Sequence, residues 1–326
     1  MPTEMDVAAF CRQSGVLILA GKGGVGKTTV AASVARAASL AGLDVMLIEL
    51  EGRTGAAALL GHPAPLDYRE VELAEAKDGA GSIRARSLTP DDVLVDYLAE
   101  RGLGKLSRRL ASTGALDVVA TAVPGFRDVL VLGKVKQLEK SDHADLVILD
   151  APAAGHALTF LTSASGLAEV ARVGPIRTQA ADVAEMLSDP DRCRVMLVTL
   201  PEETPVNETA ETAIELRDRV GVTLAPVVVN AVLPRVDGVE QQMEDAAALS
   251  VVGTEMRDAL VEAARFRLRR LELQARQMER LAEALDLPQL RLPDLFAPAS
   301  DVGSVDQLAK AFGAAVEGLP DGLKVA

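Results

Sequence analysis

Short runs of consecutive apolar residues recur along the chain without alternating regularly with polar positions. Five such runs stand out, at residues 16–20, 45–50, 146–149, 195–198 and 227–229. Runs of this length are typical of strands that are buried on both faces, as in a parallel sheet covered by helices. Between the first two runs, residues 27–40 are rich in Ala, repeat Val30, Val34 and Ala38 at four-residue spacing, and are followed by Gly42. This pattern predicts a crossover helix between parallel strands.

Two further stretches carry helical periodicity. Within residues 89–140, apolar positions recur at Val93, Leu94, Leu98, Leu106, Leu110, Val129, Leu132 and Val135. The second stretch, residues 157–187, comes after the apolar run that ends before Asp150. Polar and helix-breaking residues are expected to divide it into short helices, at Ser163, Ser165, Gly166 and Pro175. We expect the two stretches, from about residue 89 to 135 and from about 156 to 190, to pack together as a helical subdomain above the sheet.

A long helical pattern occupies about residues 243–286. Its apolar positions alternate four and three residues apart, at Ala264, Leu268, Leu271, Ala275, Met278, Ala282 and Leu285. This spacing fits either a coiled-coil seam or, more plainly, a helix that lies across the sheet. The segment is also rich in arginine, which fits a solvated helix face or a docking surface for an acidic partner.

The composition is that of a folded protein without nucleic-acid-binding character. Hydrophobic residues make up 49% and charged residues 25%, which allows a sizeable core. We expect one elaborated domain over residues 14–318. Aromatic residues make up only 2% and the net charge is −13, so neither base stacking nor non-specific binding to nucleic acid is expected.

The cysteines, the N-terminal residues and the lengths of the apolar runs indicate the cellular compartment of the protein. Cys11 and Cys193 are the only cysteines, and they form no pattern typical of disulfide, zinc or iron-sulfur proteins. The first fifteen residues include Glu4 and Asp6 and lack the apolar region of a secretory signal. No apolar run approaches the roughly 20 residues that span a bilayer. We therefore expect a cytoplasmic protein that is not itself transmembrane.

The strongest chemical signal is the glycine-rich segment 21–29, Gly-Lys-Gly-Gly-Val-Gly-Lys-Thr-Thr. It follows a predicted strand and opens a predicted helix, as a phosphate-binding P-loop requires. Lys27 is expected to reach the β- and γ-phosphates of ATP, and the Thr28 hydroxyl is expected to bind Mg²⁺. The other loop residues expected to contact the nucleotide are Gly23, Gly24, Val25, Gly26 and Thr29. The fold class is then α/β, a doubly wound, mostly parallel sheet with the nucleotide at the carboxyl ends of its strands.

This loop resembles the Lys-Gly-Gly-x-Gly-Lys-Thr loop of the deviant-Walker-A P-loop ATPases. That group includes the ParA and MinD partitioning ATPases, the nitrogenase iron protein and the ArsA-type ATPases. In the group, the extra lysine reaches across a two-fold axis to the nucleotide of the partner subunit. The resemblance therefore implies a trans-acting role for Lys22 and a dimer that sandwiches the nucleotides.

Further motifs resemble the ArsA branch, which contains the arsenite-pump ATPases and the ATPases that target tail-anchored membrane proteins. Residues 150–156, Asp-Ala-Pro-Ala-Ala-Gly-His, resemble its switch II. The resemblance implies that Asp150 holds Mg²⁺ through water and that the Gly155 amide senses the γ-phosphate. It also implies that Asn230 pairs with adenine and that Leu292 and Pro293 cover the adenine edge. Other matches in the family's order are Pro124-Gly125, Asp128, Pro201-Glu202 and Glu208-Thr209.

Switch I departs from the pattern of the arsenite-pump and targeting ATPases. Residues 49–53, Glu-Leu-Glu-Gly-Arg, are most similar to the ArsA-like ATPases of actinobacteria. Glu51 stands where the other ATPases have the Asp of Asp-Pro-Ala, which orients the attacking water. A displacement of about 1 Å can lower a rate by roughly 10²-fold. Glu51 is thus either the water-positioning carboxylate of a slow ATPase or a residue that caps or salt-bridges locally.

Three functions remain open at this point. The first is an ArsA-like ATPase whose nucleotide-dependent dimer, with Mg²⁺ and ATP bound, changes the surface offered to an unknown helical client or membrane partner. The second is a ParA-like or MinD-like positioning ATPase, which the net charge and the lack of a basic amphipathic helix at residues 318–324 disfavour. The third is a weakly active ATP-binding subunit of a hetero-oligomer. The dimer is either a homodimer or a heterodimer with a paralogous ATPase that supplies the Asp-Pro-Ala loop.

Overall fold

The computed structural model describes most of the 326-residue chain. The described residues are 6–50, 55–62, 64–100, 102, 125–141, 143–171, 174–235, 238, 253–296 and 301–319. Two predicted site residues fall outside these ranges, Glu51 of switch I and Pro124, so their expected roles stay predictions.

A nine-stranded, mostly parallel sheet forms the centre of the molecule, in the order β3-β4-β2-β5-β1-β6-β8-β9, with β7 paired to β6. The strands are β1 (Val16–Gly21), β2 (Val45–Leu50), β3 (Val71–Ala74), β4 (Ile83–Leu88), β5 (Leu146–Ala153), β6 (Cys193–Thr199), β7 (Thr223–Leu224), β8 (Val227–Val232) and β9 (Gln289–Pro293). Only β3 against β4 is antiparallel among the described pairs. Each of the five apolar runs lies in a strand, which confirms the predicted fold class.

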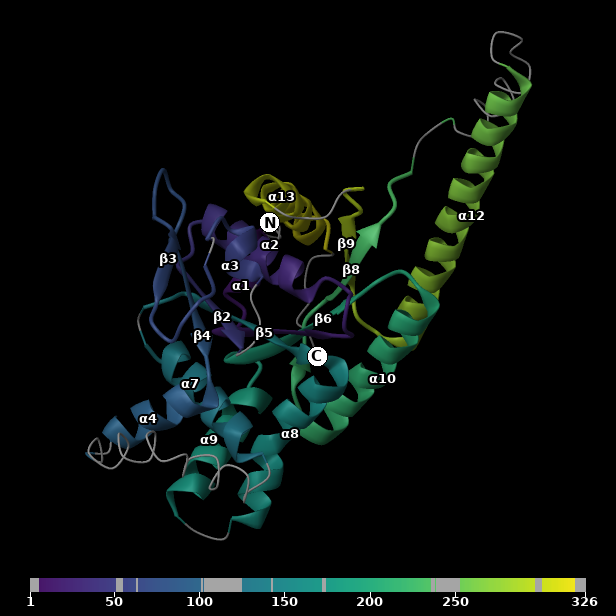
Figure 1. Cartoon of the computed structure of the whole chain (residues 1–326). Helices are drawn as coiled ribbons and strands as arrows, with labels where there is room; N and C mark the ends of the chain where they lie inside the picture. The colour runs from purple at the N-terminus through teal and green to yellow at the C-terminus, as the bar shows by residue number, and fades with distance from the viewer. Residues whose placement is uncertain are drawn as a thin grey trace, which may run out of the picture.

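Helices cover both faces of the sheet (Figure 1). One face carries α4 (Pro90–Glu100), α7 (Phe126–Glu139), α8 (Ala154–Val170), α9 (Pro175–Ser188) and α10 (Glu203–Val220). The other carries α1 (Val7–Cys11), α2 (Lys27–Leu40), α3 (Ala56–Leu59) and α13 (Val302–Glu317). Side chains along β1 alternate between the two cores, with Ile18 in one and Leu19 in the other. This alternation follows from the two-residue period of a strand and explains why the strand is apolar throughout.

The helices expected to form a subdomain do contact one another, α4 with α7 and α8 with α9. They also share one continuous core with the sheet. The prediction that residues 157–187 break into several short pieces is wrong for their first half, because α8 runs unbroken through Gly166. Ser163 and Ser165 donate their hydroxyls to carbonyls of their own helix, at 2.7 and 3.1 Å, and so remain compatible with it. The break at Pro175 is confirmed, since this residue begins α9.

A polar cluster ties α4 to α7 and to the segment before β3. Asp96 of α4 accepts hydrogen bonds from the Tyr68 hydroxyl at 2.7 Å and from the ammonium of Lys134 in α7. Burial raises the pKa of Asp96, but these two hydrogen bonds together with the positive charges of Lys134 and Arg86 outweigh it, so the pKa is lowered. The guanidinium of Arg86 in β4 lies 4.3 Å from the Tyr68 ring centre. The helical layer is therefore anchored to the sheet by charge as well as by apolar packing.

The long helix predicted at about residues 243–286 is α12 (Thr254–Ala284). It does not lie across the sheet as predicted. Its buried residues, Gln274 and Leu281, lie in its C-terminal half, where it contacts α10, and Arg267 near its middle donates a hydrogen bond to the carbonyl oxygen of Pro234. Its N-terminal end projects away from the rest of the molecule (Figure 1), where Met256 and Leu260 are 60% and 53% exposed. Within the described ranges no second helix pairs with this end, so the coiled-coil alternative finds no partner among those residues.

The core begins before the predicted boundary at residue 14. Phe10 of α1 is buried and packs edge-on against Phe312 of α13, with ring centroids 5.9 Å apart. An N-terminal helix and a C-terminal helix thus close the same face of the sheet. In the described part of the chain, no helix combines the length and the apolar character needed to cross a membrane.

Candidate functional site

The P-loop lies between β1 and α2, at the carboxyl end of the central strand of the sheet. Gly24 and Gly26 have φ angles of +87° and +88°, which residues with a side chain rarely adopt. A Cβ atom at Gly26 would also lie 2.4 Å from Nδ2 of Asn230. The loop therefore needs glycine at Gly26 for backbone shape and for the close approach of β8.

Lys27 points back over this loop. Lys27 is only 6% exposed, and its ammonium donates a hydrogen bond to the carbonyl oxygen of Lys22 at 3.0 Å. This hydrogen bond holds the positive charge at the mouth of the loop, where the predicted phosphates would lie. Of the neighbouring loop residues, Val25 is buried and Gly23 and Gly24 are exposed, so backbone rather than side chains faces the solvent there.

Thr28 of α2 meets Asp150 in the carboxyl-terminal half of β5. The Thr28 hydroxyl donates to Oδ2 of Asp150 at 2.6 Å, and Asp150 is fully buried. A hydroxyl and a carboxylate are the hard oxygen ligands that Mg²⁺ prefers. The predicted pair is therefore brought together by α2 and β5, and its chemistry fits a magnesium ion. The carbonyl oxygen of the next loop residue, Thr29, accepts a hydrogen bond from the Ser33 hydroxyl within α2.

Glu49 is a buried carboxylate that the sequence reasoning did not single out as a site residue. It lies at the end of β2, is 1% exposed, and is in register with Asp150 on the neighbouring strand. Its Oε1 atom accepts from the amides of Ala57 at 2.9 Å and Gly55 at 3.4 Å. A charged residue inside the otherwise apolar run of 45–50 was the signal that could have identified it.

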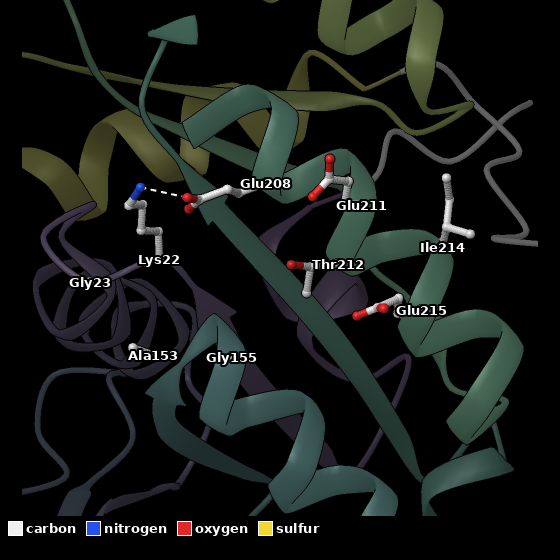
Figure 2. Close-up of a pocket in the computed structure, with 9 residues that line it drawn as sticks. All are labelled: Lys22, Gly23, Ala153, Gly155, Glu208, Glu211, Thr212, Ile214 and Glu215. Carbon is white, nitrogen blue, oxygen red and sulfur yellow. Dashed lines mark hydrogen bonds and ion pairs between the residues drawn. The ribbon is translucent and has the colours of Figure 1, made fainter. Parts of the chain in front are cut away.

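Lys22 forms an ion pair within its own chain. Its ammonium lies 2.6 Å from Oε1 of Glu208 on α10, and the two side chains are 39% and 38% exposed (Figure 2). The pair borders an open pocket of about 580 Å³ that the P-loop, the start of α8 and one face of α10 enclose. Two further carboxylates, Glu211 and Glu215, and the exposed side chain of Ile214 line the same pocket. Lys22 is thus at the surface, beside an acidic helix face.

The residues assigned to adenine lie at one end of β8 and β9. Asn230 donates from Nδ2 to the carbonyl oxygen of Val25 at 3.0 Å, which fixes its amide against the P-loop. Pro293 pairs with Val232, two residues farther along β8. Leu292 is fully buried in the core below α13. Its side chain therefore cannot face a base in this arrangement, and a contact there would fall to Pro293 or to backbone atoms.

The switch II residues 150–156 span the end of β5 and the first turn of α8. Gly155 is exposed in the first turn of α8, beside the pocket that Lys22 borders. Its amide is therefore close to the P-loop opening, and its predicted γ-phosphate contact remains a prediction. Asp128 lies in the first turn of α7, where burial raises the pKa of its carboxyl group.

Comparison with known proteins agrees with this geometry. Residues 16–287 match the family described as the CobQ/CobB/MinD/ParA nucleotide binding domain. The ATPase BagA of Mycobacterium tuberculosis is 32% identical over 322 residues, which cover 92% of this chain and 93% of that protein.

More distant relatives carry the names expected from the motifs. An arsenical pump-driving ATPase of Escherichia coli is 26% identical over 257 residues, covering 72% of this chain and 42% of that protein. The ATPase GET3 of Podospora anserina is 27% identical over 146 residues, covering 44% of this chain and 41% of that protein. These relatives confirm the resemblance to ArsA-type ATPases. The chain belongs to the CobQ/CobB/MinD/ParA family of nucleotide-binding domains, and it is related within that family to the ArsA-type ATPases.

Proposed function

We propose that the protein binds Mg²⁺-ATP at the P-loop and hydrolyses it to ADP and phosphate. The observation that carries this proposal is the convergence of Lys27, Thr28 and Asp150 at the carboxyl ends of β1 and β5. Lys27 exchanges its backbone acceptor for phosphate oxygens, which bind a cation more strongly because they are charged. Thr28 and Asp150 hold the magnesium ion, Asp150 through water, and the Gly155 amide binds the γ-phosphate.

The bound magnesium ion supplies charge neutralisation for the phosphates. The protein's own contribution is positioning, because phosphoryl transfer depends chiefly on placement and on electrostatic stabilisation. Asp150 can orient the ion firmly since it is fully buried and held by Thr28. Glu51 is the proposed water-positioning carboxylate, and its extra methylene makes slow turnover the expected behaviour.

We also propose that the ATP-bound protein dimerises across the P-loop face, with Lys22 reaching the nucleotide of the partner. The partly exposed position of Lys22 at the pocket rim supports this, since its ammonium can be reached from a neighbouring molecule. A homodimer is the simpler form, because two-fold homodimers are the commonest oligomers. A heterodimer with a paralogous ATPase is the alternative that Glu51 favours.

The dimer is proposed to change the surface that it offers to a client or partner protein. The projecting end of α12 supports this idea, since Met256, Leu260 and Phe266 expose 60%, 53% and 63% of their surface. Exposed apolar side chains gathered on one element commonly mark interaction sites. Opening and closing of a dimer would move such an element relative to its copy in the partner subunit.

The test is calorimetric binding of Mg²⁺-ATP combined with a phosphate-release assay. Lys27→Ala removes a charge-assisted contact, so the affinity for Mg²⁺-ATP should fall by about 10- to 100-fold. Lys310→Ala, which alters an exposed lysine on α13, is the matched control and should bind as the parent does. Equal affinity of the parent and Lys27→Ala would overturn the P-loop assignment. Binding without phosphate release by the parent would favour the weakly active subunit.

A further inference from the structure

Among the described residues, one carboxylate oxygen of Glu49 has hydrogen-bond partners and the other has none. Oε1 accepts from the amides of Gly55 and Ala57, whereas Oε2 is buried and has no hydrogen-bond partner among the described residues. Buried polar atoms are nearly always paired, and an ionised oxygen is the costliest to leave unpaired. We therefore expect Oε2 to accept a hydrogen bond from a donor that is present in the functional, ligand-bound state.

The Glu49 side chain, which carries Oε2, lies beside Thr28 and Asp150, the two residues proposed to hold the magnesium ion. Glu49 is in register with Asp150 on the adjacent strand, so the two side chains leave the sheet on the same face. Asp150 accepts from Thr28, and a Cβ atom at Gly55 would lie 2.8 Å from Cγ2 of Thr28. Gly55 in turn lies 3.4 Å from Glu49, from amide nitrogen to Oε1. These contacts form a closed ring, which confines the Glu49 carboxylate to the immediate surroundings of Thr28 and Asp150.

We propose that Glu49 is an outer positioning residue of the magnesium site, with Oε2 accepting a hydrogen bond from a water molecule bound to the ion. Mg²⁺ gives up its water reluctantly and usually keeps several molecules, whose hydrogens need acceptors. Carboxylates that hold such ligands in place typically change metal affinity by 10- to 100-fold. This inference rests on the proposed binding of Mg²⁺-ATP at the P-loop.

The same carboxylate links the end of β2 to the start of α3. Residues 50–54 separate Glu49 from Gly55 in the sequence, and Oε1 accepts hydrogen bonds from the backbone amides of Gly55 and Ala57. Glu49 thus holds the start of α3 close to Asp150 and Thr28. A competing explanation is that Glu49 serves only as a backbone acceptor at the start of α3, and the two explanations differ in what Oε2 does.

Glu49→Gln separates these explanations. Glutamine keeps an oxygen at Oε1 for the two amides and keeps the side-chain shape, but it puts an NH₂ group, which is a donor, in place of Oε2. The apparent affinity for Mg²⁺ is measured by titrating the ion into the protein with ATP, and independently by electron paramagnetic resonance with Mn²⁺. We expect the metal affinity to fall by about 10-fold or more, while binding of ATP without metal and the thermal midpoint stay near those of the parent.

Two variants complete the design. Glu72→Gln, on the exposed edge strand β3, is the matched control and should titrate as the parent does. Ala57→Pro removes an amide N–H that donates to Oε1 while leaving the Glu49 carboxylate intact, so it tests the backbone role alone. We expect Ala57→Pro to lower the thermal midpoint with a much smaller change in metal affinity than Glu49→Gln shows.

The outcomes are distinguishable. Unchanged metal affinity in Glu49→Gln would overturn the inference while leaving the proposed function intact. Equal loss of metal affinity in Ala57→Pro and Glu49→Gln would overturn it as well, since the effect would then come from the backbone contacts. Failure of Glu49→Gln to fold would likewise count against it, because the charge would then serve the fold. If the parent itself does not bind Mg²⁺-ATP, the proposed function fails first.

Discussion

Single polar contacts in this protein hold the P-loop in shape and leave defined atoms for a ligand. Asn230 shows this most clearly, because Nδ2 binds the carbonyl oxygen of Val25 while an amide side chain has a second hydrogen and an oxygen to offer. The residue can therefore stabilise the loop and contact a base at once. The two roles predict different effects on nucleotide binding.

Asn230→Ala should reduce the preference for ATP over GTP by roughly 5- to 10-fold, which is the effect of about one hydrogen bond. Loss of the contact to Val25 should weaken both nucleotides equally and so leave the ratio unaffected. Competition binding with ATP and GTP measures the ratio. Asn207→Ala, on the exposed surface of α10 where Asn207 binds Arg280, is the control. A ratio equal to that of the parent would show that Asn230 serves the loop alone.

Site residues were predictable from sequence where a backbone turn dictated them. The glycines and Lys27 follow from the needs of a phosphate loop, and Asp150 was identified through the resemblance of residues 150–156 to switch II. Glu49 was overlooked because its role depends on the neighbouring strand, which only the sheet order brings next to it. The pairing of Lys22 with Glu208 was equally hidden, since 186 positions separate the two residues.

Elements were predictable where both faces are buried or where a helix has a clear end. The five apolar runs and α2 are of this kind. β4 was not predicted, because it carries Arg84 and Arg86, whose charges face Glu70 at the edge of the sheet. The position of α12 was also not predictable, since its apolar stripe continues beyond the part that α10 covers. A pattern along a helix gives its apolar face but not how much of that face is covered.

The uneven burial of α12 predicts effects of very different size on the free energy of unfolding from the same substitution at two positions. Leu281 is 1% exposed, so Leu281→Ala should lower the free energy of unfolding by about 2–5 kcal/mol. Leu260 is 53% exposed, so Leu260→Ala should change it by no more than about 0.5 kcal/mol. Denaturant titration of each variant, with the slope of the transition checked against the parent, measures both values. Similar losses would mean that the projecting end of α12 is covered in solution.

At the scale of the whole molecule, the ion pair of Lys22 with Glu208 bears on the proposed dimer. Both side chains are more than one third exposed, and exposed ion pairs contribute only about 0–1 kcal/mol. Phosphate oxygens of a partner's nucleotide are a stronger acceptor, because they carry more charge and would be shielded from water by the interface. The internal pair can therefore open when the dimer forms, and Glu208 competes only weakly for Lys22.

Two substitutions at this pair should move association in opposite directions. Lys22→Ala should abolish dimer formation in the presence of Mg²⁺ and a non-hydrolysable ATP analogue, while leaving the fold and most of the nucleotide affinity intact. Glu208→Gln removes the competing charge and should strengthen association by no more than about 5-fold, since the pair is worth about 1 kcal/mol or less. Light scattering over a range of protein concentrations measures both effects.

Unchanged association of Lys22→Ala would remove its proposed role across the axis, and weaker association of Glu208→Gln would assign Glu208 a contact of its own. A parent that stays monomeric alone but associates with a paralogous ATPase carrying the Asp-Pro-Ala loop would replace the homodimer by the heterodimer, because each chain would then complete the other's site.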